Sequence, residues 1–264
     1  MYLSRIVLVL LFAMAFIYAR AVNAFMGTNV LILPADSMDA FHFIGFSTMN
    51  GKNALHDARA AARSSSVVGV IRAATMACGY AHAAATSAVR STRGVRGGSV
   101  LDADHLRAGA ANFYLASLAL DTAYSAQQVA MDANRGDTNV GAGTDASAYS
   151  PPVQRVVDAM ATQAREAREL CQTTMEAASV GDLPGATAHA LDCRHHARTA
   201  VEAVHRTAAH LLHDGPGDCS IADHRALCQM FKFTALCLAA ASSALVIVDD
   251  MDSNVADPNN DTVR

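Results

Sequence analysis

Apolar residues recur at three- and four-residue steps along most of the chain, a pattern that predicts amphipathic helices. The clearest stretch runs from Asp182 to His213. Asp182 is a candidate N-cap, Pro184 is tolerated in a first helical turn, and Gly215-Pro216 is a stop signal. The apolar positions of this stretch are Leu191, Ala197, Val201, Val204, Ala208, Leu211 and Leu212. The sequence therefore predicts one long helix here, with a stripe on which other helices can pack.

The same periodicity predicts helices on both sides of this stretch. They are expected at about 54–90, 102–134, 151–180 and 221–248. Ser64-Ser65-Ser66 either splits the first of them or caps a second piece. Asp102 or Asp104 begins the second, and Gly181 ends the third.

Helices joined by short connections pack as antiparallel neighbours. We therefore expect an all-α fold, an up-and-down four-helix bundle preceded by an N-terminal helical extension or hairpin. The expected divisions are a signal peptide at 1–24, a loosely structured leader at 25–53, the helical bundle domain at 54–249 and a polar tail at 250–264.

Composition supports helices and limits the function. Hydrophobic residues make up 52% of the 264 positions, yet aromatic residues make up only 6% and tryptophan is absent. Much of the apolar content is alanine, the best helix former, whereas strands favour β-branched and aromatic residues. The formal net charge of -4 and the lack of a basic block argue against a nucleic-acid partner.

The N-terminus has the pattern of a secretory signal peptide. Arg5 precedes the apolar run Ile6–Tyr18, and small residues around Ala24 offer a cleavage site. The run is shorter than the ~20 apolar residues that a spanning helix needs. The C-terminal run Phe233–Val248 is interrupted by serines, so we interpret it as a buried helix. We expect a secreted protein with no membrane contact after cleavage.

Six cysteines in a secreted chain favour disulfides, although six cysteines allow fifteen complete pairings. They are Cys78, Cys171, Cys193, Cys219, Cys228 and Cys237, and their spacing matches no zinc pattern. Asn260 begins the sequon Asn-Asp-Thr in the polar tail, where glycosylation is possible.

One group of side chains has the spacing of a metal site. His189, Cys193 and His196 share a helical face, and imidazole and thiolate there could bind zinc or copper. A second face could use His210 and His213. The interpretation that we favour is a disulfide cysteine flanked by solvated histidines, because no carboxylate is placed to orient the imidazoles.

Motifs of catalysis are missing from the sequence. There is no G-x-S-x-G, and the glycines at 94, 97 and 98 lack the strand and the G-K-[ST] of a phosphate loop. We therefore expect no catalytic residue, no metal, no cofactor and no enzymatic activity.

Two short motifs suggest a family. Ala190-Leu191-Asp192-Cys193 is followed by an alanine-rich run at 200–204, and Cys228-Gln229-Met230-Phe231 comes on the next predicted helix. With these motifs the chain resembles the plant invertase and pectin methylesterase inhibitor family over about residues 67–248. The family's Pro-Lys-Phe motif is missing, and Cys78 lacks the second cysteine of the family's N-terminal hairpin.

The resemblance implies a four-helix bundle preceded by a helical hairpin, with a disulfide between Cys193 and Cys228. The competing arrangement pairs Cys219 with Cys228 or Cys171 and leaves Cys193 free. The implied function is inhibition of a cell-wall carbohydrate enzyme, pectin methylesterase before invertase, by binding through a face of the middle bundle helices. The implied location is the extracellular cell wall. The alternative is a secreted helical structural or signalling protein with no enzyme target.

Overall fold

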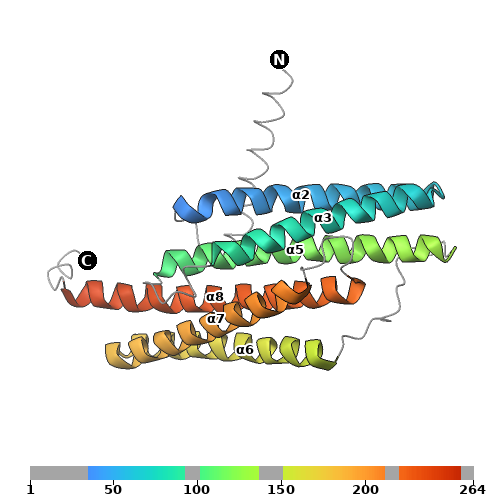
Figure 1. Ribbon diagram of the computed structural model, residues 1–264. Helices are drawn as coiled ribbons and strands as arrows, with labels where there is room; N and C mark the ends of the chain where they lie inside the picture. The colour runs from blue at the N-terminus through green and yellow to red at the C-terminus, as the bar shows by residue number, and fades with distance from the viewer. Residues whose placement is uncertain (1–34, 93–101, 137–150, 212–219, 257–264) are drawn as a thin grey trace, which may run out of the picture.

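The computed structural model describes residues 35–92, 102–136, 151–211 and 220–256, of which 94% are helical and none form strands. The helices are α2 (Ala35–Arg63), α3 (Val67–Ser91), α5 (Ala103–Asn134), α6 (Pro151–Ser179), α7 (Leu183–Leu211) and α8 (Ile221–Ala256). Each of these helices runs antiparallel to the one before it (Figure 1). The predicted all-α helical bundle is confirmed, and it has an N-terminal helical hairpin, α2–α3. The expected four-helix bundle of the last four helices is wrong, because α5 packs on α2, α3 and α8 instead of on α6 and α7.

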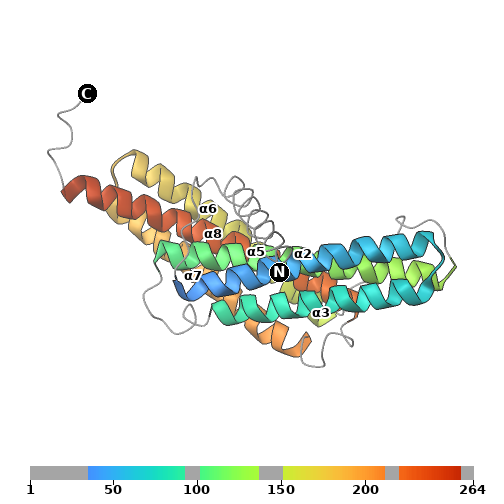
Figure 2. The ribbon, with the colours of Figure 1, turned by 90° about the horizontal axis from the view of Figure 1, so that it is seen from above.

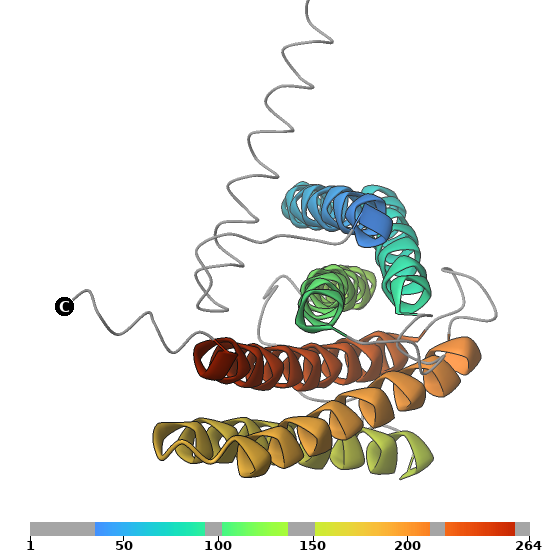
Figure 3. The ribbon, with the colours of Figure 1, turned by 90° about the vertical axis from the view of Figure 1, so that its left-hand side faces the viewer.

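The helices are stacked in tiers. Hairpin α2–α3 lies on one outer side, hairpin α6–α7 lies on the other, and α5 and α8 lie between them (Figure 3). Helix α5 packs on α2, α3 and α8, and α8 packs on α5, α6 and α7. Among the described residues α5 has at most marginal contact with α6 or α7. The connection from α5 to α6, residues 135–150, is long enough that chain neighbours need not be packing neighbours.

A short stretch of α5 is buried on all sides. The six consecutive residues from Ala108 to Phe113 are all buried, although an amphipathic surface helix would expose about half of them. Small residues at Gly109, Ala110 and Ala111 let the surrounding helices approach closely. From this central position α5 contacts both helices of the first hairpin, α2 and α3, and also α8.

The described helices form two units with the same layout. The N-terminal unit is α2, α3 and α5, and the C-terminal unit is α6, α7 and α8. Within each unit a hairpin packs against a third, long helix, and the two third helices pack on one another antiparallel. The units are staggered lengthwise, so each projects beyond the other (Figure 2).

The register of the two units matches in detail. The N-cap of α3 is Ser66 and that of α7 is Asp182, a shift of 116 positions, and each side chain accepts the backbone N–H of a glycine three residues on. When residues of the two hairpins are paired by this shift, buried positions in one hairpin correspond to buried positions in the other. Examples are Ile44 with Met160, Gly51 with Ala167, Ala74 with Ala190, Ala77 with Cys193 and Ala84 with Ala200.

The third helix of each unit, α5 or α8, shows a similar correspondence, with a shift of 118 positions. Their N-terminal residues Asp102 and Ser220 both accept hydrogen bonds from the first helical turn. Phe113 is equivalent to Phe231, and these two buried rings meet at a centroid distance of 4.9 Å where α5 crosses α8. The fold therefore has an approximate two-fold arrangement with this aromatic pair at its centre.

The expected loose leader at 25–53 is wrong for residues 35–53, which belong to α2. Phe41, Ile44 and Leu55 are buried on the stripe that faces the bundle. Gly51 does not mark a loop, because a Cβ there would lie 2.9 Å from Oγ1 of Thr122 on α5. The glycine allows two helices to approach closely.

The expected boundary at 249 is also wrong, because α8 continues to Ala256. Asp249 and Asp250 are exposed on the helix surface, and the Ser253 hydroxyl donates to the carbonyl of Asp249 at 2.8 Å. Aspartates do not break a helix as glycine or proline does. The next such residue is Pro258, which disfavours helix at the position before it.

Candidate functional site

The hairpin α2–α3 is closed by the three residues Ser64 to Ser66. The amides of Ser65 and Ser66 donate to the carbonyls of Ala62 and Ala61, which is a Schellman motif, and Ser65 has a left-handed φ of 60°. Ser66 then caps α3. This tight turn places the two helices side by side along most of their length.

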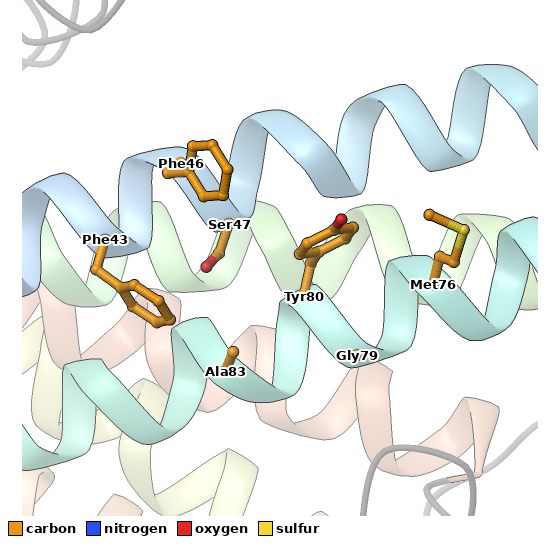
Figure 4. A pocket seen from close by; sticks show the side chains of 7 residues that line it. All are labelled: Phe43, Phe46, Ser47, Met76, Gly79, Tyr80 and Ala83. Carbon is orange, nitrogen blue, oxygen red and sulfur yellow. The ribbon is translucent and has the colours of Figure 1, made fainter.

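An apolar groove lies between the two helices on the outer side of the hairpin (Figure 4). Its volume is about 330 Å³, and it is lined by Phe43, Phe46, Ser47, Met76, Gly79, Tyr80 and Ala83. The side chains of Phe43 and Tyr80 project into the gap between the helices in Figure 4. Gly79 has no atom within 4 Å of the place where a Cβ would be, so the floor of the groove is open there.

The groove exposes large apolar side chains to solvent. Phe43 is 47% exposed, Phe46 is 52% exposed and Met76 is 47% exposed. The polar side-chain groups of the lining are the hydroxyls of Ser47 and Tyr80. The lining contains no carboxylate, imidazole, ammonium or thiol that could supply acid–base or nucleophilic chemistry. The groove is therefore suited to holding apolar side chains of a partner.

The C-terminal unit has no equivalent of this apolar surface. The shift of 116 positions takes Phe43, Phe46, Met76 and Tyr80 to Ala159, Thr162, Asp192 and His196. Two units with the same buried stripe thus differ on this face. The exposed aromatic residues are not a requirement of the fold.

The predicted disulfide between Cys193 and Cys228 is not formed, and both residues are free cysteines. The Cys193 thiol donates to the carbonyl of Ala167 on α6 at 3.1 Å, whereas the Cys228 thiol donates to the carbonyl of Ser117 on α5 at 3.3 Å. The two side chains point from different helices toward different neighbours. Burial raises the pKa of each thiol to about 12.

The face that carries His189, Cys193 and His196 does not assemble a metal site. Nδ1 of His196 lies 2.7 Å from Oε1 of Gln163 and 3.5 Å from a carboxylate oxygen of Glu166, while Cys193 is turned into the core. Among the described residues no group of three or more histidine, cysteine or acidic side chains is placed to hold a metal ion.

Several predicted features lie outside the described residues. These are the signal peptide at 1–24, the first ten residues of the leader, Cys219, His213 and the sequon at Asn260.

Two helices are long and apolar enough to cross a membrane by length and composition alone, Val67–Ser91 and Ile221–Ser253. Both pack against other helices of the bundle, and 39% and 44% of their apolar windows are buried inside the protein. Core helices of soluble proteins pass the same test, so these spans carry little weight.

No protein-family model, no curated protein and no solved structure gives a significant match to this chain. The sequence signal for the groove was weak, because its residues come from two helices whose pairing was not known. The only available signal was the set of aromatic and methionine residues that fall outside the buried stripes of α2 and α3.

Proposed function

We propose that this protein acts by binding another protein through the apolar groove between α2 and α3, without chemistry of its own. The exposed Phe43, Phe46 and Met76 carry the proposal. Scattered apolar residues on a surface are ordinary, but a contiguous apolar patch marks an interaction site. Aromatic residues and methionine are enriched in protein interfaces, where aromatic rings supply contact area with little loss of conformational entropy.

The partner that we propose is a secreted pectin methylesterase, with invertase as the second choice. The target rests on the resemblance of the stretches at 190–193 and 228–231 to the inhibitor family. The N-terminal helical hairpin is the part of the architecture that supports the resemblance, whereas α5 to α8 do not form its four-helix bundle. A rigid helical surface suits an inhibitor, because a preorganised surface lowers the ordering cost of binding.

A second candidate is a secreted helical protein with a structural or signalling role and no enzyme target. The observation that favours it is the free state of Cys193 and Cys228, which removes the covalent link implied by the resemblance. The two candidates share the groove and differ in the partner that fills it.

The test is an inhibition and binding assay with the full chain and purified pectin methylesterase. We expect the protein to slow the esterase without consuming substrate itself. The variants Phe43→Ser and Phe46→Ser should weaken binding by about tenfold or more, because central aromatic residues dominate interface energies. Both residues are about half exposed, so their replacement should leave the helical CD spectrum unchanged.

The matched control uses the outer face of the other hairpin. Met175 on α6 is 56% exposed and Leu191 on α7 is 45% exposed, so Met175→Ser and Leu191→Ser remove comparable apolar surface. These variants should bind as the wild type does. If only the α6–α7 variants lose binding, the groove is not the contact surface. If neither esterase nor invertase is slowed by a large excess of folded protein, the enzyme target is rejected. A dimer that Phe43→Ser converts to monomer would show that the groove holds a second copy.

A further inference from the structure

Three cysteines gather in the core of the C-terminal unit, one from each helix. They are Cys171 on α6, Cys193 on α7 and Cys237 on α8, and the first and last of them lie near enough to Cys193 to influence its thiol electrostatically. Cys193 and Cys237 have no exposed surface, whereas Cys171 is half-buried. All three are free thiols in the structure.

A backbone carbonyl brings Cys193 next to Cys171. The Sγ atom of Cys193 lies 3.1 Å from the carbonyl oxygen of Ala167. In an α-helix that same oxygen accepts the amide N–H of the residue four positions on, which is Cys171. The thiol of Cys193 therefore lies beside the turn of α6 that runs from Ala167 to Cys171.

The directions of the side chains favour a short distance between the two thiols. Every Cα–Cβ bond in a helix tilts toward the helix N-terminus. Helices α6 and α7 run antiparallel (Figure 1). By this rule the Cα–Cβ bond of Cys171 points toward the level of Ala167, and that of Cys193 points toward the C-terminal end of α6, where Cys171 follows Ala167. Small residues at Ala167 and Ala190 keep the two helices close. The equivalent positions in the N-terminal unit, Leu55 and Ala77, also lie in one packed cluster.

Electrostatics agree with this placement. Burial is the main cause that raises the pKa of Cys193 to about 12, and the thiols of Cys171 and then Cys237 raise it further. Coulombic effects weaken with distance, so both thiols lie near Cys193.

We propose that Cys171 and Cys193 are a disulfide-forming pair that links α6 to α7 when the chain meets a small disulfide oxidant such as oxidised glutathione. This pairing does not depend on the partner proposed for the groove. It replaces Cys228 as the partner of Cys193.

The reaction is an ordinary double thiol–disulfide exchange. The half-buried Cys171 thiolate attacks oxidised glutathione, forming a mixed disulfide and releasing one glutathione thiol. The Cys193 thiolate then attacks the Cys171 sulfur, forming the protein disulfide and releasing the second glutathione. The two protein protons end on the two glutathiones, and the two electrons pass to the glutathione disulfide.

The chain offers a convenient readout, because no lysine or arginine lies between Arg168 and Arg194. Trypsin therefore leaves both cysteines on one peptide, 169–194. After incubation of the full chain with oxidised glutathione, alkylation in denaturant without reductant should leave this peptide unmodified and lighter by two hydrogen atoms. Cleavage after Glu176 should separate its halves only after reduction. Oxidation should also raise Tm by roughly 5–10 °C.

Variants separate this pair from its competitors. Cys171→Ala should make Cys193 alkylate after oxidation and should abolish the rise in Tm. Cys228→Ala is the matched control. It should keep the protection of Cys193 from alkylation and the rise in Tm after oxidation, because Cys228 faces α5. The wild-type peptide map stands even if a variant fails to fold. The proposal is overturned if Cys193 of the oxidised wild type alkylates freely. It is overturned equally if Cys193 is linked to peptide 233–264, which carries Cys237, or to peptide 226–232, which carries Cys228.

Discussion

His224 lies where the first turn of α8 meets α5, with no exposed surface. Its Nδ1 atom is 2.8 Å from Oε1 of Gln127, and its Nε2 atom is buried without a hydrogen-bond partner. Burial lowers the pKa of His224 to about 4, against the opposing effect of Asp223, while His82 lowers it further. The folded protein therefore holds a neutral imidazole.

This histidine predicts a stability that falls in acid. The unfolded imidazole takes up a proton near pH 6.5 and the folded one near pH 4, so its contribution is complete above about pH 6.5. It is lost as the pH falls toward 4, by roughly 3 kcal/mol in total. The N-terminal unit has Leu106 at the equivalent position, so His224→Leu should flatten the dependence of unfolding free energy on pH over this range. The exposed His195→Gln should not. The measurement is urea unfolding at several pH values. The prediction is contradicted if the unfolding free energy of wild type and of His224→Leu changes equally with pH.

At the scale of elements, the two hairpin turns are nearly the same structure. Both helices α2 and α6 end in a Schellman motif, and both turns finish with the N-cap of the next helix. They differ at the left-handed position, which is Gly181 in one turn and Ser65 in the other, with φ values of 75° and 60°. A residue with a Cβ is strained in this conformation.

The difference predicts opposite effects of two substitutions. Ser65→Gly should raise the free energy of unfolding by roughly 0.5–1 kcal/mol, and Gly181→Ser should lower it by a similar amount. Urea unfolding of both variants at one pH measures the effects. Changes of the same sign would mean that the strain at Ser65 is relieved by neighbouring contacts.

Sequence reasoning was strongest at helix ends. Asp102, Asp182 and Gly181 end or begin helices as predicted, because capping depends on residues a few positions apart. It failed for residues 35–53, expected in a loose leader, where Gly51 serves a contact with a distant helix. The groove and the free state of Cys193 were beyond prediction for the same reason. Both depend on which faces of separate helices meet, and no local pattern specifies that.

At the scale of the whole molecule, the two units meet along α5 and α8. The contact is antiparallel: the Ser242 hydroxyl donates to the carbonyl of Ala103 near one end, and His224 meets Gln127 near the other. Phe113 and Phe231 lie between these points. The two units therefore contact each other through equivalent faces of their third helices, as the subunits of a two-fold symmetric dimer do.

This arrangement predicts the behaviour of an isolated unit. A fragment of residues 35–136 would expose the face of α5 that α8 covers, including Phe113. We expect two copies to pair through α5 in place of α8, giving a homodimer by light scattering. The fragment variant Phe113→Asp should lose the dimer. A stable, well-folded monomer of the unaltered fragment would refute the prediction.

The alanine-rich core has a consequence for how this protein tolerates change. Ala81, Ala116 and Ala241 are completely buried, and helices meet across them with little side chain between. In a leucine-rich core the damaging substitutions remove methyl groups and leave cavities. At these alanine positions there is one methyl group to remove and little space to receive more, and overpacking forces backbones apart. Replacing one of these alanines by valine or leucine should therefore destabilise the fold more than replacing it by glycine, although both of these larger residues are common in protein interiors.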